Sequence, residues 1–472
     1  MRGILSWGGY LPHRRLDRQT IRSVAGAGGG RGTRSVASYD EDAITLGVAA
    51  ARTALRAAPA EPRALWFATT EPPYLDRTNA TTLHAALRLG RDVPAYDAVG
   101  SVRSALGALR AACDAASPAL VVAGDLRGGL PGGADEAAGG DGAAAVLIGS
   151  GADGPVVAEI LARASVTEEF VDRWRVPGEP ASRLWEERFG ETRYTALGTE
   201  TLKLALGEAG LEAPAVDTLI VAGLHGRAAK AVAARSGVPA ERVADRLDAT
   251  VGNVGAAQPA LLLAAALEED RTEGRIIVLL SLADGADALV LRTTSALAAH
   301  PVERPVTEQI ASAAPVSYGT YLAWRGLLPV EPPRRPEPAR PSASAAARNG
   351  DWKFGLVGSQ GEDGMVRMPP SPLDGTAAPM AGTAGTIVTF TVDRLAYSPS
   401  PPVVFAVVDF DGGGRLPIEL TDVDEGDVAI GTRVEPTFRR LFTSDGIHNY
   451  FWKARPLAEP EREPAREPEK EA

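Results

Sequence analysis

Residues 64–71 read ALWFATTE, residues 100–112 read GSVRSALGALRAA and residues 141–149 read DGAAAVLIG. A second series with the same features reads TLIVAGLH at 218–225, GNVGAAQPALLLAAAL at 252–267 and DGADALVL at 284–291. In both series an apolar run ends in a polar residue, a glycine opens a turn into a helical run, and Asp-Gly-Ala leads into another apolar run. Three shared landmarks in one order predict an internal duplication.

The separations between landmarks also agree, being 29 residues from Glu71 to Gly100 and 27 residues from His225 to Gly252. Short apolar runs flanked by turn residues predict buried strands at 64–70, 119–124, 143–149, 218–223, 275–282 and 288–292. Alanine-rich runs predict helices at 42–57, 104–116, 199–209, 227–236 and 259–269. Alternating strands and helices predict an α/β layered fold over residues 1–330.

The remainder of the chain differs in composition. Residues 331–350 are rich in Pro, Arg, Ala and Ser without periodicity, which predicts an extended linker. Residues 381–455 contain five β-rich runs separated by Pro, Gly and Asp, a pattern typical of a small barrel such as an OB-fold. The charged, proline-rich residues 456–472 predict a disordered acidic tail.

Composition argues against several classes of function. The net charge of −11 argues against nucleic acid as the main partner. Every run of 18 residues contains a charge or a turn residue, and no apolar stretch follows the basic N-terminus, so we expect neither a membrane span nor a secretory signal. Cys113 is the only cysteine, which excludes an internal disulfide and a multi-cysteine metal site. We therefore expect a soluble cytoplasmic protein.

Several stretches resemble known families. The duplicated block, with GILSWGGYLPHRRLDRQTI (3–21) and RSVASYDEDAITLGVAAARTAL (34–55), resembles the thiolase superfamily, in particular 3-hydroxy-3-methylglutaryl-CoA synthase and ketoacyl synthase III. WKFGLVGS (352–359), the residues 385–423 and GIHNYFWKARP (446–456) resemble the OB-fold domain with a zinc ribbon that accompanies acyl-CoA thiolases and synthases. The resemblance implies a thiolase-like αβαβα fold, then an all-β OB-fold domain, with an acyl-CoA thioester as ligand.

The chemistry of the resembled family requires four catalytic residues. A Cys thiolate takes the acyl group, a His and an Asn hold the thioester or enolate oxygen, and a Glu transfers protons. By position, Glu71, His225 and Asn253 match the last three, whereas Val102 stands where the Cys is expected. Val102 cannot act as a nucleophile, and the adjacent Ser101 is one residue out of register.

Each matched residue also has a structural interpretation. His225 could be a loop histidine, Glu71 a solvated carboxylate, and Asn253 a turn residue or helix cap. Cys113 lies three helical turns beyond Val102, and we interpret it as a buried inert thiol.

The arginines near the N-terminus are candidates for binding the CoA phosphates, and an unpartnered surface arginine is the alternative for each of Arg14, Arg15, Arg31 and Arg34.

Residues 351–380 depart from the resembled zinc ribbon. Gly361 and Gly364 stand where its first pair of cysteines is expected, and no cysteine follows. Because structural zinc needs four ligands, usually Cys or His, we predict an irregular, metal-free ribbon remnant. No cofactor is then expected apart from coenzyme A as the carrier of the substrate.

Three functions remain open. The first is an acyl-CoA-binding enzyme that forms or cleaves carbon–carbon bonds without a Cys nucleophile, by an aldol or retro-aldol reaction or a decarboxylation. The second is a non-catalytic scaffold or regulatory subunit of a thiolase, because the nucleophile and the zinc ligands are both missing. The third is an active synthase with Ser101 as nucleophile. The resemblance also implies a homodimer or a hetero-oligomer with a thiolase-like subunit.

Overall fold

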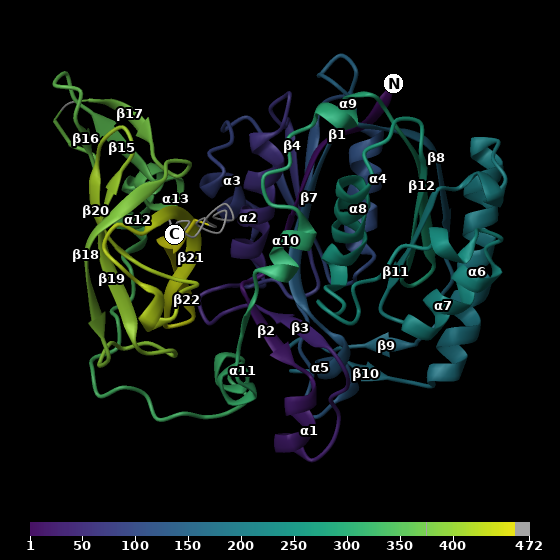
Figure 1. The fold of residues 1–472 in the computed structure, drawn as a ribbon, viewed down its shortest axis with the longest axis horizontal. Coiled ribbons are helices and arrows are strands. Elements are labelled where there is room, and N and C mark those ends of the chain that lie inside the picture. The colour runs from purple at the N-terminus through teal and green to yellow at the C-terminus, as the bar shows by residue number, and fades with distance from the viewer. Residues whose placement is uncertain (374, 458–472) are drawn as a thin grey trace, which may run out of the picture. The chain divides into compact units, whose positions relative to one another are not determined.

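A computed structural model describes residues 1–373 and 375–457, which form two compact units (Figure 1). The large unit contains Met1–Glu331 and Arg440–Phe442, and the small unit contains Pro332–Arg439 and the chain from Thr443. The tail predicted at 456–472 lies outside the described residues from 458 onward. No helix among the residues placed by the structure is both long and apolar enough to cross a bilayer.

A nine-stranded sheet runs through the large unit in the order β11-β12-β13-β8-β1-β7-β6-β4-β5. Its first-half strands are β1 (Arg2–Tyr10), β4 (Ala64–Thr69), β5 (Ala95–Val99), β6 (Ala119–Leu126) and β7 (Asp141–Ser150). Its second-half strands are β8 (Ala158–Val166), β11 (Thr218–Gly223), β12 (Ile276–Leu282) and β13 (Ala286–Thr293). Four strands of each half follow the same order outward from the β1–β8 junction.

The directions of the strands repeat as well. β4 is parallel to β6 as β11 is to β12, and the next two neighbours are antiparallel in both halves. The halves join where Gly3 and Ile4 of β1 pair with β8. A Cβ atom on Gly3 would lie 2.1 Å from the Ala158 carbonyl oxygen, so the junction requires a residue without a side chain. The predicted duplication is confirmed.

Helices form three layers around the strands (Figure 1). The inner layer is α4 (Ser104–Asp114) and α8 (Gln258–Glu269), which share one apolar core with strands of both halves. One outer layer is α2 (Ala43–Arg56) with α3 (Ala80–Ala86). The other is α6 (Glu187–Ala209) with α7 (Gly226–Arg235), which cover β8 and β11–β13. The result is the predicted αβαβα arrangement, and the apolar composition of α8 follows from its burial between strands of both halves.

The smaller elements of the large unit surround this layered core. A three-stranded sheet contains β2 (Arg14–Asp17), β3 (Thr33–Val36) and β14 (Ala314–Pro315). The short helices are α1 (Gln19–Ala25), α5 (Ala134–Ala138), α9 (Ala296–Ala299), α10 (Val306–Ala311) and α11 (Tyr318–Trp324). The two-stranded ribbon β9 (Arg173–Trp174) and β10 (Arg183–Leu184) lies in the segment that connects β8 to α6.

The small unit contains the predicted five-stranded sheet, in the order β20-β19-β18-β21-β22. Its strands are β18 (Gly385–Asp393), β19 (Val403–Phe410), β20 (Arg415–Glu419), β21 (Arg433–Ser444) and β22 (Ile447–Pro456). Alternating burial along β19 places Val404, Ala406 and Val408 in the interior, as expected for a sheet with one covered face.

Residues 331–380 contain more regular structure than their sequence predicted. The range predicted as an extended linker includes helix α12 (Ala343–Arg348). Ser342 caps the start of this helix, and three alanines after Ala343 favour the helical conformation. The range predicted as irregular contains α13 (Gly350–Gly355) and a regular sheet of β15 (Val357–Gln360), β16 (Val366–Arg367) and β17 (Thr376–Pro379). Leu356, Met368 and Met380 are buried there, so apolar packing supports this sheet.

Candidate active site

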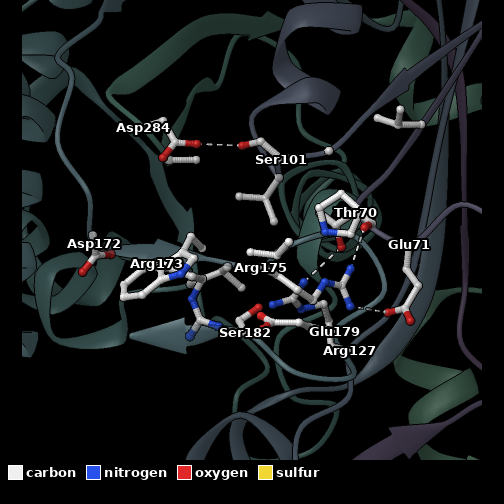
Figure 2. Close-up of a pocket in the computed structure, with 18 of the residues that line it drawn as sticks. Thr70, Glu71, Ser101, Arg127, Asp172, Arg173, Arg175, Glu179, Ser182 and Asp284 are labelled. Atoms are coloured by element: carbon white, nitrogen blue, oxygen red, sulfur yellow. Dashed lines mark hydrogen bonds and ion pairs between the residues drawn. The ribbon is translucent and has the colours of Figure 1, made fainter. Parts of the chain in front are cut away.

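A cavity of about 570 Å³ lies in the large unit (Figure 2). Its walls come from the ends of β4 and β6, the turn before α4, the segment that carries β9 and β10, the start of α7 and the turn after β12. Of the three residues predicted to act in catalysis, Glu71 and His225 line this cavity, as does Val102 at the position where the Cys was expected. Asn253 does not.

Glu71 directly follows the end of β4 with its carboxylate half exposed. The side chain is 51% accessible, and its Oε2 lies 3.3 Å from Arg175 Nη1. Arg175 also donates a hydrogen bond to the Thr70 carbonyl oxygen at 2.8 Å, which fixes the guanidinium beside the strand end. Glu71 is therefore an exposed carboxylate that also has an arginine partner on the cavity wall.

The turn before α4 places Val102, the position at which the sequence resemblance led us to expect a Cys, on the cavity wall. Gly100 opens this turn with φ of 109°, a conformation that other residues rarely adopt. The neighbouring Ser101 hydroxyl donates a hydrogen bond to Asp284 Oδ2 at 2.8 Å, across the cavity from Glu71 (Figure 2). The Ser101 hydroxyl thus has a carboxylate as its hydrogen-bond acceptor at the cavity.

His225 is the N-cap residue of α7. Its Nδ1 accepts a hydrogen bond from the Ala228 backbone N–H at 3.2 Å, and its Nε2 lies 2.9 Å from the Glu187 carbonyl oxygen. A neutral ring with the proton on Nε2 satisfies both contacts. Both ring nitrogens are thus engaged by the backbone, although the ring lines the cavity.

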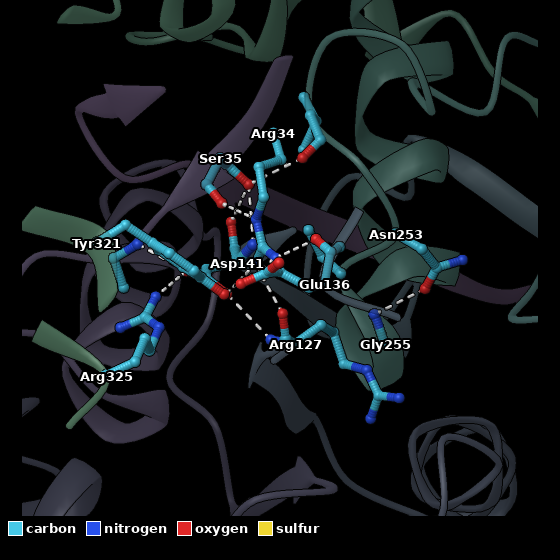
Figure 3. A network of polar contacts seen from close by, with 12 residues as sticks. Arg34, Ser35, Arg127, Glu136, Asp141, Asn253, Gly255, Tyr321 and Arg325 are labelled. Carbon is cyan, nitrogen blue, oxygen red and sulfur yellow. Dashed lines mark hydrogen bonds and ion pairs between the residues drawn. The ribbon is translucent and has the colours of Figure 1, made fainter. Parts of the chain in front are cut away.

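Asn253 has a structural role in the second Gly-led turn. Its side chain is buried, with Nδ2 donating to the Gly223 carbonyl oxygen at 2.9 Å and Oδ1 accepting from the Gly255 N–H at 2.9 Å (Figure 3). The amide therefore joins the end of β11 to the start of α8. The alternative of a turn residue describes this placement, whereas a role in holding a ligand oxygen does not.

Sequence reasoning missed five charged residues of the cavity, namely Arg127, Asp172, Arg173, Arg175 and Glu179. Arg127 follows β6, and Asp172 precedes β9 with only 8% of its surface exposed. Burial raises the pKa of Asp172, and the nearby His225 and Arg173 oppose that shift in part. None of these residues lies in a repeated landmark, so only the fold, which brings residues 172–182 and the end of β6 to one cavity, could identify them.

A buried polar network lies next to the cavity, centred on Asp141 at the start of β7 (Figure 3). Asp141 pairs with Arg325 and with Arg34, the latter at 3.3 Å, and accepts backbone N–H bonds from Ala37 at 2.7 Å and Arg127 at 3.0 Å. Arg34 is completely buried in this network.

Arg34 and Arg15 therefore fit neither interpretation offered for them, since each is buried and bonded within the protein instead of lying unpartnered at the surface or open to a phosphate. Arg34 belongs to the network, and Arg15 is buried with its guanidinium donating to the carbonyl oxygens of Pro12 and Gln309. Cys113 is buried on α4, and burial raises the pKa of its thiol, as expected for an inert residue. Across residues 1–373 and 375–457, no three His, Cys, Asp or Glu side chains gather in a way that could hold a metal ion.

Comparison with known proteins identifies two regions. Residues 206–292 match the family described as the C-terminal part of 3-oxoacyl-[acyl-carrier-protein] synthase III. Residues 377–439 match the family described as the C-terminal OB-fold domain of ChsH2. The second match covers most of the five-stranded sheet of the small unit.

Relatives and solved structures extend the first match. The hydroxymethylglutaryl-CoA synthase of Archaeoglobus fulgidus is 29% identical over 343 residues, covering 69% of this chain and 98% of that enzyme. The structure of MvaS in complex with 3-hydroxy-3-methylglutaryl coenzyme A has a TM-score of 0.59 at 20% identity, covering 72% of this chain and 94% of MvaS. FabH, the 3-oxoacyl-(acyl carrier protein) synthase III of Pseudomonas aeruginosa, has a TM-score of 0.55 at 21% identity, covering 62% and 98%.

The large unit has the thiolase-like fold. The small unit is an OB-fold domain. Both predicted resemblances are confirmed, and the cavity lies at the ends of the duplicated strands of the thiolase-like unit.

Proposed function

We propose that the thiolase-like unit binds an acyl-CoA thioester in this cavity and makes or breaks a carbon–carbon bond without forming an acyl-enzyme. The cavity itself carries the proposal, because it collects Glu71, Val102 and His225 from distant parts of the sequence. Its volume of about 570 Å³ falls within the range of small-molecule sites. The relatives named hydroxymethylglutaryl-CoA synthase support the thioester as ligand.

The residue at position 102 restricts the reaction. Val102 offers no nucleophile, so the acyl group stays on the coenzyme throughout. Aldol or retro-aldol chemistry on a 3-hydroxyacyl-CoA and decarboxylation meet that condition. In an aldol cleavage, a base removes the proton from the 3-hydroxyl group and the electrons of the C2–C3 bond pass to the thioester as an enolate. Glu71 is the proposed proton-transfer group, since its carboxylate faces the cavity.

The first test fills the cavity. Val102→Phe should abolish the rise in melting temperature that an acyl-CoA gives the wild type. A ligand at 100 times its Kd stabilises the folded state by about 2.7 kcal/mol. Val24→Phe is the control, because Val24 lies on α1, is exposed and does not line the cavity. An equal shift in both variants would contradict binding in this cavity.

A second test restores a thiol. Val102→Cys should react with iodoacetamide and take up an acyl group from an acyl-CoA, detected by mass spectrometry. The thiol would lie at the start of α4, where the helix dipole favours a thiolate. Ser101→Cys is the matched control one residue away, and buried Cys113 contributes little background. Labelling of Ser101→Cys alone would contradict the assignment of position 102.

A non-catalytic subunit of a thiolase complex is the second candidate function. The contacts of His225 and Asn253 favour it, because both residues are occupied by backbone groups. Purification of the tagged full chain from its host should then recover a thiolase-like subunit in a fixed ratio, and the purified chain alone should cleave no 3-hydroxyacyl-CoA. Cleavage that depends on Glu71, measured with Glu71→Gln, would contradict this candidate.

A further inference from the structure

The two side chains that the sequence resemblance assigned to a thioester oxygen are engaged elsewhere. Both ring nitrogens of His225 contact backbone groups of the protein. Asn253 is buried, bonds to Gly223 and Gly255, and does not line the cavity. A negative charge that develops on a ligand in this cavity therefore needs a different donor.

Three arginines line the cavity, and two of them already have a carboxylate partner. Arg173 forms a bidentate ion pair with Asp135, with both N–O distances 2.7 Å. Arg175 pairs with Glu71 at 3.3 Å. Because these charges are matched within the protein, neither guanidinium is left to balance a charge on a ligand.

The third arginine, Arg127, makes no ion pair with any carboxylate in the described part of the chain, and its guanidinium donates one hydrogen bond, to Thr70 Oγ1 at 3.0 Å. The carboxylate that most influences it is already saturated. Asp125 accepts hydrogen bonds from the hydroxyls of Thr69 and Thr70 and from the N–H groups of Thr70 and Ala256, at 2.7–3.0 Å. Asp125 uses both oxygens in these bonds, so it holds the strand ends together and leaves the guanidinium without a partner of opposite charge.

Arg127 is held in place from three sides. Its N–H donates to Asp141 Oδ1 at 3.0 Å, and its carbonyl oxygen accepts from Arg34 Nη2 at 2.6 Å. Its side chain passes over Gly255, where an added Cβ would lie 2.7 Å from Arg127 Cδ. Figure 3 shows the side chain leaving the buried network, and Figure 2 shows it at the cavity.

Arg127 and Glu71 meet at the end of β4. Arg127 bonds to the side chain of Thr70, and Glu71 is the next residue along the chain (Figure 2). In an acyl thioester, the C2 proton that a base removes and the oxygen that then gains the negative charge belong to neighbouring carbon atoms. A carboxylate and a guanidinium at one strand end therefore suit the two ends of one enolate.

The surroundings of Arg127 favour an oxyanion in the transition state. Burial lowers the pKa of Arg127, and Arg173 and Arg175 also act against its charge, while Asp125 favours it. A negative oxygen that forms beside the guanidinium relieves this cost, whereas the neutral thioester of the ground state does so much less. Because the guanidinium is already positioned, little reorganisation opposes the reaction.

We propose that Arg127 is a catalytic residue that holds the thioester oxygen when it becomes an enolate, in place of His225 and Asn253. This inference rests on the proposed function. In the cleavage of a 3-hydroxyacyl-CoA, Glu71 accepts the proton of the 3-hydroxyl group and C3 becomes a carbonyl carbon. The electron pair of the C2–C3 bond moves into the C1–C2 bond, and the C1 oxygen takes the negative charge beside Arg127. Glu71 then returns its proton to C2, which restores the thioester carbonyl and the carboxylate.

The reverse of this last step can be measured by itself, as exchange of the C2 protons of butyryl-CoA in deuterated water. Mass spectrometry gives the exchange rate, and calorimetry gives the Kd. The proteins are the full-length wild type, Arg127→Gln, Arg127→Lys, Glu71→Gln and the control Arg235→Gln. Arg235 is an exposed arginine at the end of α7 and does not line the cavity.

The wild type should exchange the C2 protons, and Glu71→Gln should not, because it lacks the base. Arg127→Gln should slow the exchange about 100- to 1,000-fold and leave the Kd for butyryl-CoA unchanged. Arg127→Lys should retain part of the rate, since it keeps the charge but not the planar guanidinium, and Arg235→Gln should retain all of it. This split between rate and Kd separates a contact with the enolate from a purely structural role.

Exchange by Arg127→Gln at the wild-type rate would overturn the inference and leave the proposed function standing. A weaker Kd with an unchanged rate in the bound complex would assign Arg127 to a group charged in the ground state, such as a phosphate of coenzyme A, and would also overturn it. A wild type that binds butyryl-CoA without exchange would overturn the inference and leave thioester binding standing. Failure of the wild type to bind butyryl-CoA would overturn the inference and the proposed function together.

Discussion

The ends of β4 and β11 occupy equivalent places in the two halves of the thiolase-like unit, yet their polar residues meet different surroundings. Glu71, after β4, is ion-paired on the cavity wall. His225, after β11, has both ring nitrogens bound to backbone groups. In the first half the polar group remains available to a ligand, whereas in the second half it completes a helix end.

The Gly-led turns show the same contrast. Ser101 lies on the cavity wall, and its hydroxyl reaches across to Asp284. Asn253, which also follows a turn glycine, is buried and joins Gly223 to Gly255. At the Gly-led turns, the side chain of the first copy lies at the cavity, whereas that of the second copy joins backbone groups.

At the Asp-Gly landmarks the contrast is the opposite one, since the buried side chain belongs to the first copy. Asp141 of the first copy is fully buried between Arg34 and Arg325, whereas Asp284 of the second copy is exposed in a turn. We therefore predict that Asp141→Asn lowers the free energy of unfolding by about 3–5 kcal/mol, because it leaves buried guanidinium groups without a counter-charge. Urea denaturation should show this loss, and Asp284→Asn should change stability by less than about 1 kcal/mol. Equal losses of stability in the two variants would contradict this difference between Asp141 and Asp284.

Substitution of the turn residues should have the next largest effect. Asn253→Ala should cost about 1–3 kcal/mol, since it leaves the buried Gly255 N–H without an acceptor. The Gly223 carbonyl oxygen keeps a bond from Arg246 Nη2 at 2.9 Å, which limits the loss. Ser101→Ala should cost less in the same denaturation experiment. A more stable Asn253→Ala than Ser101→Ala would show that the second turn does not carry the scaffold role.

The strand-end residues should separate stability from binding. His225→Ala should cost about 1 kcal/mol through loss of the cap on α7, and His225→Ser should restore most of it because serine also caps helices. Glu71→Ala should leave stability within about 0.5 kcal/mol. Thermal unfolding gives both values. If His225→Ser were as unstable as His225→Ala, capping would not be the contribution of this histidine.

The smallest expected effect is on the pH dependence of stability, and it concerns Asp172 in the segment between the two halves. Burial raises the pKa of Asp172 in the folded state, so the folded protein holds this proton more tightly than the unfolded chain does. The resulting stability is fully present below the ordinary pKa of about 3.9 and is lost as pH rises through the raised pKa. Asp172→Asn lacks this loss. From pH 4 to neutral pH, the melting temperature of Asp172→Asn should therefore rise relative to that of the wild type. If the difference between the two melting temperatures did not change with pH, a raised pKa of Asp172 would be contradicted.

Local patterns predicted most of the layered fold. The predicted strand at 218–223 coincides with β11, and the predicted helix at 259–269 begins one residue after α8 does. Apolar runs and alanine-rich runs determine such elements without knowledge of their neighbours. The helix predicted at 199–209 is only the last part of α6, whose earlier residues alternate buried side chains such as Tyr194 and Leu197 with exposed charged ones and include two glycines.

The site was less accessible from the sequence. Glu71, Val102 and His225 could be placed because each follows or opens a repeated landmark. The orientation of the Asn253 amide depends on the Gly223 carbonyl oxygen, thirty residues away in the sequence. Whether Arg127 has an ion-pair partner depends on Asp125, whose two oxygens accept hydrogen bonds from other donors. Whether a polar group is free for a ligand is decided by its neighbours in space, which one sequence does not reveal.

The passage of Arg127 over Gly255 also constrains how this protein can evolve. A methyl group at position 255 would meet Asp125 Oδ2 at 2.2 Å and Arg127 Cδ at 2.7 Å, so neither copy of the duplicated sequence can drift independently there. Loss of the arginine alone would not make substitution of the glycine tolerable, because Asp125 lies still closer and the φ of Gly255 is +59°. Among homologous sequences, glycine should therefore be kept at this position even where the arginine after β6 has been lost.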